Sequence, residues 1–210
     1  MTTLTRSTTR SIWLPLLAFV PLVACGDGTA PAPSGRLAEE LHFLRPAASA
    51  PPLATTEVSF WAKRGEDREA RIRYEPLPGA SDTAEFLRFS VPSAALDRRP
   101  DGTAFAAGDS VLITLRVADQ TRMIVEFQPA GLRFSPADPA RLRIEYGEAD
   151  HDLDGDGLID GRDAVLETQL SVWRQEAPGQ PWYPVPSADA PDLDEVEANI
   201  LGFTSYALAY

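Results

Sequence analysis

The chain has 210 residues, and its 31 acidic residues outnumber 19 lysines and arginines, which gives a net charge of −12 at pH 7. A surface this negative argues against binding to nucleic acid and against electrostatic adhesion to anionic lipids. Two histidines and one cysteine leave little material for zinc sites, disulfides or histidine-based catalysis.

The first 24 residues have the pattern of an export signal. The stretch "MTTLTRSTTR" carries Arg6 and Arg10 and no acid, and "SIWLPLLAFVPLVA" is an apolar run that ends at small residues. The run has about 14 residues, whereas a transmembrane helix needs about 20. We therefore predict a cleaved lipoprotein signal peptide over residues 1–24. Because it holds two arginines and no acid, its removal would change the net charge from −12 to −14.

The end of this run, Leu22-Val23-Ala24-Cys25, resembles a bacterial lipobox. The resemblance implies cleavage before Cys25, a diacylglyceryl group on its sulfur and acylation of the new amino terminus. Two or more acyl chains anchor a protein stably, whereas one binds only marginally. We expect a lipid-anchored protein of the cell envelope, at the outer membrane in a cell with two membranes, because Gly26 is not the aspartate of an inner-membrane retention signal. The alternative is an ordinary signal peptide with a chance cysteine.

Two regions follow the signal peptide. Residues 25–55 are rich in Pro, Ala and small polar residues, a composition typical of a flexible tether. Within the tether, "RLAEELHFL" predicts a short helix, since Leu37, Leu41 and Leu44 share one helical face. Residues 56–210 consist of short alternating segments separated by turns, so we expect one folded domain there.

Alternation of apolar and polar residues predicts an all-β domain. In "SVLITLRV", every second residue from Val111 to Val117 is apolar, and "FLRFSVP", "MIVEFQP", "RLRIEY", "LSVWRQ", "EVEANI" and "SYALAY" follow similar patterns. The stretch "EVSFWAKRGEDREARIRY" holds two alternating runs around Gly65 and predicts a hairpin. No convincing helical period extends over ten residues after residue 57. We predict a single antiparallel β-sandwich of about eight or nine strands.

Five segments in chain order carry a resemblance to a known family. They are "FSVPSAAL", "GDSVLITLRV", "EFQPAGLRFSPADPARLRIEY", "LSVWRQE" with "QPWYPVP", and "EANILGFTSYAL", over roughly residues 85–210. Together they resemble the ZU-five domain, a β-sandwich of ankyrins, netrin receptors and many bacterial envelope proteins. The resemblance implies a fold more securely than a function. Some members cleave themselves at His-Phe-Ser; the matching Gly202-Phe203-Thr204 lacks the histidine base, so we expect no self-cleavage.

A calcium loop is predicted as an insertion at residues 150–163. The oxygen ligands expected at loop positions 1, 3, 5, 7, 9 and 12 are Asp152, Asp154, Asp156, the carbonyl of Leu158, Asp160 and Asp163. Gly157 occupies the sharply turning sixth position, and Ile159 at the eighth is expected to point inward. Hard oxygen ligands without cysteine favour calcium over zinc.

Two departures from the EF-hand pattern limit the role of this loop. The twelfth position holds Asp163 instead of the longer glutamate, and the segment before the loop is predicted as a strand. The segment "AVLETQL" after it would make one or two helical turns. We therefore predict a single structural calcium ion with an affinity on the order of 0.1–1 mM, since no second loop cooperates. The alternative is a solvated acidic turn without a specific ion.

No catalytic residue is assigned. The sequence lacks HExxH, Gly-x-Ser-x-Gly and a glycine-rich phosphate loop. Trp182 and Tyr183 lie between prolines, where they would form an exposed platform for a sugar or peptide, or where the tryptophan would fill the space between two sheets.

The favoured interpretation is a non-enzymatic cell-envelope lipoprotein: a structural or interaction module, stabilised by calcium, that contacts an unidentified envelope protein or glycan. The alternative is a polysaccharide- or peptide-binding surface module that uses Trp182 and Tyr183. A third interpretation is a carboxylate-dependent hydrolase, because 31 acids allow many pairs, although no pair stands out.

Overall fold

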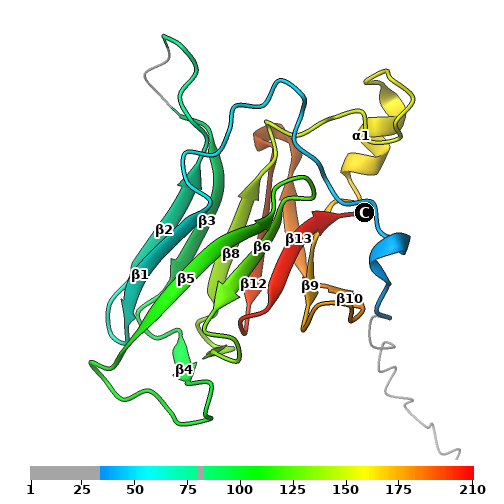
Figure 1. The fold of residues 1–210 in the computed structure, drawn as a ribbon. Coiled ribbons are helices and arrows are strands. Elements are labelled where there is room, and N and C mark those ends of the chain that lie inside the picture. The colour runs from blue at the N-terminus through cyan, green and yellow to red at the C-terminus, as the bar shows by residue number, and fades with distance from the viewer. Residues whose placement is uncertain (1–33, 80–82) are drawn as a thin grey trace, which may run out of the picture. The chain divides into compact units, whose positions relative to one another are not determined.

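The structure, a computed structural model, describes residues 34–79 and 83–210. Most of this part of the chain forms antiparallel strands in two main sheets, as Figure 1 shows, so the predicted all-β sandwich is confirmed. The predicted signal peptide and Cys25 lie outside the described residues.

The larger sheet has six strands, and its spatial order differs from the chain order. In spatial order they are β1 (Glu57–Lys63), β5 (Ser110–Asp119), β6 (Ile124–Gln128), β13 (Ser205–Ala209), β9 (Ser171–Gln175) and β10 (Trp182–Pro184). The last strand of the chain therefore lies in the interior of this sheet, between β6 and β9.

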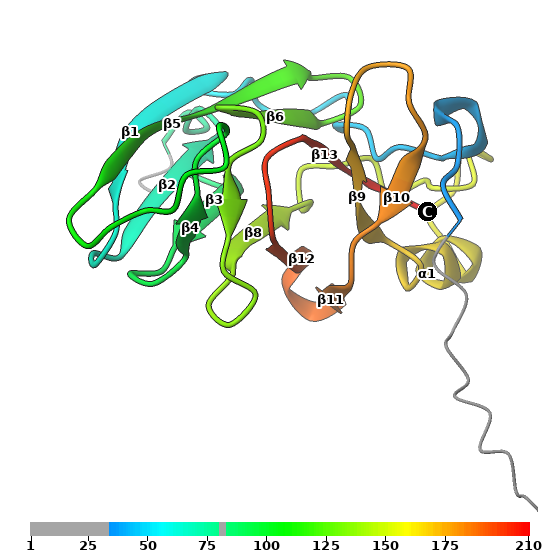
Figure 2. The same ribbon diagram turned by 90° about the horizontal axis from the view of Figure 1, so that it is seen from below.

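The second sheet has five strands and faces the first across the core (Figure 2). In spatial order they are β11 (Ser187–Ala190), β12 (Glu195–Ile200), β8 (Ala140–Glu145), β3 (Glu85–Val91) and β2 (Arg68–Arg73). Two short strands, β4 (Leu96–Arg98) and β7 (Arg133–Phe134), pair separately. The helical elements are η1 (Ala38–Glu40), α1 (Gly161–Glu167) and η2 (Pro191–Leu193). No helix in the described ranges is long and apolar enough to cross a membrane.

The predicted hairpin around Gly65 is wrong. β1 pairs with β5 and β2 pairs with β3, so the chain passes from one sheet to the other between them. The connection is held by hydrogen bonds to other loops: the Gly65 amide donates to the Ser93 carbonyl at 2.7 Å, and the Ser93 amide donates to the Asp67 carboxylate at 2.7 Å. An alternating pattern places one face of each strand toward a core, and that condition is met equally by a hairpin and by strands in facing sheets.

Aromatic side chains fill the space between the sheets. The ring of Phe89 on β3 lies 5.1 Å from that of Phe127 on β6, and both rings contact Phe203, which precedes β13. Phe134 and Tyr206 complete this cluster. All five side chains are at most 3 % exposed. Such edge-to-face and tilted pairs contribute beyond the area that they bury.

The predicted tether is wrong from residue 34 onward, because residues 34–55 lie along the sandwich. We call these residues the N-terminal segment. Leu41 and Leu44 are 7 % and 2 % exposed, and the Leu44 amide donates to the Leu208 carbonyl of β13 at 3.0 Å. The predicted helix is a single turn, η1, and Leu37 remains 44 % exposed. The Pro- and Ala-rich composition suggested a segment that stays free because ordering it costs chain entropy. The burial of two leucines offsets that cost.

Candidate functional site

The acidic loop lies between β8 and α1 and is fixed to the domain at several points (Figure 1). The Asp150 amide donates to the Arg45 carbonyl at 2.8 Å, which joins the loop to the N-terminal segment. The Tyr210 hydroxyl donates to the Leu153 carbonyl, which joins the loop to the last residue. These two hydrogen bonds fix the position of the acidic loop on the domain independently of a metal ion.

Three of the predicted calcium ligands come together. Asp152, Asp154 and Asp156 each offer one carboxylate oxygen, and these oxygens lie within 4.8 Å of one another. Calcium binds oxygens at 2.3–2.6 Å, so two ligands on opposite sides of one ion are about 5 Å apart. The spacing and the all-oxygen donor set fit calcium.

Backbone amides orient these three carboxylates. Asp152 Oδ2 accepts from the Gly157 amide at 2.8 Å, Asp154 Oδ1 from the Asp156 amide at 3.1 Å, and Asp156 Oδ1 from the Leu158 amide at 2.9 Å. In each case one oxygen is engaged and the other remains for a further ligand.

The remaining oxygens have few partners. Asp152 Oδ1 is buried and has no hydrogen-bond partner among the described residues. Asp154 Oδ2 and Asp156 Oδ2 lie 3.9 Å and 3.6 Å from Arg162, whose side chain is 75 % exposed. An exposed ion pair contributes little to stability, so this guanidinium is a weak competitor for a divalent cation.

Asp163 is not one of the three converging carboxylates, and it orders the loop by accepting hydrogen bonds from backbone amides. Its side chain accepts from the amides of Leu153 at 2.7 Å, Asp154 at 3.2 Å and Asp160 at 2.8 Å, and the residue is 3 % exposed. Hydrogen bonds from backbone amides, that of Asp160 first, hold the pKa of Asp163 below its usual value. The carboxylate expected to close the loop on an ion thus already orders the loop without one.

The end of the loop departs from the predicted geometry at Ile159, which is 73 % exposed and does not point inward. Asp160 accepts from the Arg162 amide at 2.7 Å and caps α1, so the chain enters the helix directly after Ile159. To point inward, Ile159 would need an apolar surface to pack against, such as a second loop of the same kind. The described residues contain one acidic cluster of this type, so no second loop supplies that surface. The side chain of Leu158, whose carbonyl was the predicted ligand, is 65 % exposed.

A cavity of about 420 Å³ separates the acidic loop from the N-terminal segment. Asp152 and Asp154 line one side of it, and Arg45 and Arg122 contribute positive charge. Tyr210 also lines the cavity, and its ring stacks on His42 with centroids 5.2 Å apart. The two aspartates are therefore reachable from solvent, which a metal site requires for ion entry.

Of the two alternatives for Trp182, the structure supports a buried tryptophan: its side chain is 2 % exposed, so it forms no exposed platform with Tyr183. The N-terminal segment covers it: the Arg36 amide donates to the Trp182 carbonyl at 2.8 Å, and the Trp182 amide donates to the Arg36 carbonyl at 2.7 Å. Tyr183 is half-buried, and its ring approaches Gly35 so closely that a Cβ there would meet it at 2.8 Å. Among the described tryptophans, Trp61 on β1 is the exposed one, at 61 %.

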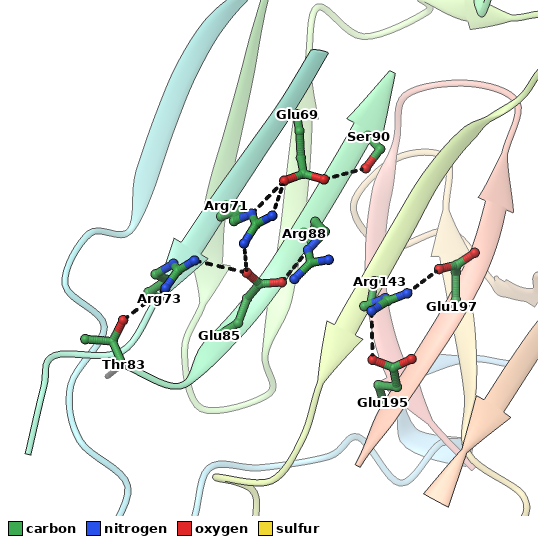
Figure 3. Close-up of polar contacts among 10 residues, drawn as sticks. All are labelled: Glu69, Arg71, Arg73, Thr83, Glu85, Arg88, Ser90, Arg143, Glu195 and Glu197. Carbon is green, nitrogen blue, oxygen red and sulfur yellow. Dashed lines mark hydrogen bonds and ion pairs between the residues drawn. The ribbon is translucent and has the colours of Figure 1, made fainter. Parts of the chain in front are cut away.

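A charged network on the outer face of the five-stranded sheet (Figure 3) was not predicted from the sequence. Glu85 is only 7 % exposed and accepts a hydrogen bond from Arg88 at 2.7 Å. The segments "REARIRY", "FLRFS" and "RLRIEY" carried the signal, because each places charged residues on its polar face. Which arginine meets which acid depends on strand register, and register is set by long-range pairing.

Comparisons of the chain with protein-family models, with curated proteins and with solved structures found no match.

Proposed function

We propose that this protein is a non-enzymatic, lipid-anchored module of the cell envelope, whose ZU-five-like sandwich contacts another envelope component and is stabilised by one calcium ion. The anchor rests on the lipobox-like residues that end at Cys25. The calcium part rests on one observation: three carboxylate oxygens from Asp152, Asp154 and Asp156 converge within 4.8 Å.

The proposed ion has a structural role. It would neutralise three carboxylates that repel one another in a connection between the two sheets, and it would satisfy the buried Oδ1 of Asp152. Leu158, Asp160 and Asp163 are proposed to supply further oxygens or to orient the loop. Asp163 already does the latter through three amides.

Thermal unfolding tests this proposal. With a dissociation constant of about 0.1–1 mM, 10 mM calcium stabilises the folded state by about 1.4–2.7 kcal/mol. For a domain of this size, that corresponds to a rise in Tm of about 3–10 °C. Asp156→Asn should remove most of the rise, and Asp192→Asn, an equal change of charge outside the cluster, should preserve it. Equal Tm values with 10 mM calcium and with excess chelator would rule out the structural ion.

A second candidate function is binding of a polysaccharide, and the observation that favours it is the exposure of Trp61. Its register partner Leu112 on β5 is 45 % exposed, so the two side chains form an apolar surface at the edge of the larger sheet. A flat tryptophan face is suited to stacking on a sugar ring. Titration of envelope polysaccharide should quench the fluorescence of the protein, and Trp61→Ala should remove this quenching. Unaltered fluorescence across a glycan panel would favour a protein partner.

A further inference from the structure

Arginines of neighbouring strands lie opposite one another on the outer face of the five-stranded sheet. Arg71 of β2 is the register partner of Arg88 of β3, and Arg88 is the register partner of Arg143 of β8. Arg141 of β8 lies opposite Ser90 in the next row. Like charges directly opposite each other destabilise a sheet, so this arrangement needs compensation.

Acidic side chains compensate most of this charge, as Figure 3 shows. Glu85 accepts from Arg88 and lies 3.3 Å from Arg71. Glu195 and Glu197 of β12 lie 3.0 Å from the two terminal nitrogens of Arg143.

Two sets of donors remain uncommitted. The side chain of Arg141 has no hydrogen bond or ion pair with any described residue. The Nε of Arg143 is buried and has no acceptor in the described part of the chain. A buried donor without an acceptor costs free energy, and more so on a charged group.

Both arginines line the same cavity, which has a volume of about 190 Å³. Arg88 and Ser90 form its side toward β3. The two acids at its rim already have partners: Glu197 is paired with Arg143, and Glu69 is paired with Arg71 and accepts from Ser90 at 3.3 Å. The groups of this cavity that still lack a hydrogen-bond partner are therefore donors, which suit an anion.

We propose that this cavity binds a single oxyanion group, a phosphate or a carboxylate, between Arg141 and the Nε of Arg143. The planar, forked guanidinium matches both anions, and hydrogen bonds between charged partners are the stronger ones. The chain as a whole is strongly acidic and repels anions, so the attraction of these arginines for an anion is confined to this small cavity. The site is independent of the acidic loop and of calcium.

Nuclear magnetic resonance titration with inorganic phosphate and, separately, with acetate tests the proposal at constant ionic strength and pH 7. Saturable shifts should be confined to amides around Ser90 and Arg141. Arg141→Gln should weaken binding about tenfold or more, because it removes charge-assisted hydrogen bonds. Since Arg141 has no partner to lose, this variant should keep the Tm of the native protein. Arg116→Gln, on the other sheet, is the matched control and should bind as the native protein does.

The two titrations also separate the sources of the anion. Saturation by phosphate alone supports a phosphate-bearing ligand, saturation by acetate alone supports a carboxylate-bearing ligand, and saturation by both supports a general oxyanion site. The proposal is overturned if neither anion saturates the shifts by 50 mM, or if Arg141→Gln binds as tightly as the native protein.

Discussion

Replacement of Leu44 by alanine tests whether the N-terminal segment belongs to the folded domain. Leu44 is 2 % exposed and forms part of the main core cluster. A buried Leu→Ala change costs about 2–5 kcal/mol, because the cavity that it leaves closes only partly. In a domain of this size, the loss corresponds to a decrease in Tm of about 4–20 °C.

The assay is urea unfolding followed by circular dichroism, with the free energy of unfolding compared between variants. Leu37→Ala is the matched control, because Leu37 is 44 % exposed in the same segment and its replacement should change this free energy by less than about 0.5 kcal/mol. If Leu44→Ala were as harmless as Leu37→Ala, the N-terminal segment would be a free tether and our assignment would be refuted.

Three further predictions concern charged residues. Glu85→Gln should lower the free energy of unfolding by about 1–3 kcal/mol, because it weakens the acceptor beside three arginines. The control Glu66→Gln, at an exposed ion pair, should change this free energy little. Equal effects of the two substitutions in urea unfolding would contradict the buried network. A side-chain hydrogen bond from Thr121, assisted by Arg122, lowers the pKa of Asp119 from 3.8 to about 2. The resulting stabilisation is about 1 kcal/mol after solvent screening. It is present above pH 4 and is lost as the pH falls toward 2, so the difference in stability between the native protein and Asp119→Asn should shrink over that interval. A difference that does not depend on pH would contradict the lowered pKa of Asp119. Arg162→Gln should tighten calcium binding by up to about fivefold, since it removes a positive charge beside the cluster, and calorimetric titration that gave weaker binding would show that Arg162 supports the site.

Local patterns were sufficient to predict the longer strands and the centre of the acidic loop, whereas the short strands β4, β7 and β11 were not predicted. Alternation from Val111 to Val117 identified β5, because successive side chains of a strand point to opposite faces. The spacing of Asp152, Asp154 and Asp156 likewise depends on one short turn, and their convergence is confirmed.

The errors concern long-range contacts, on which local patterns carry no information. Composition suggested a tether at residues 34–55, but Leu41 and Leu44 find an apolar surface on β13 and its neighbours. That same contact buries Trp182 and so excludes the exposed platform, which was one of the two alternatives for this residue. Glu85 and its arginines also depend on the pairing of β2 with β3, which no single segment encodes.

Direct calcium titration by calorimetry is the measurement that tests the central claim most directly. We predict one ion per chain with a dissociation constant of about 0.1–1 mM, and loss of this binding in Asp152→Asn, because that change alters the buried oxygen left without a partner. Asp192→Asn should bind calcium as the native protein does. The absence of saturable binding at millimolar calcium, or equal binding by Asp152→Asn, would contradict the assignment of the acidic loop as a calcium site.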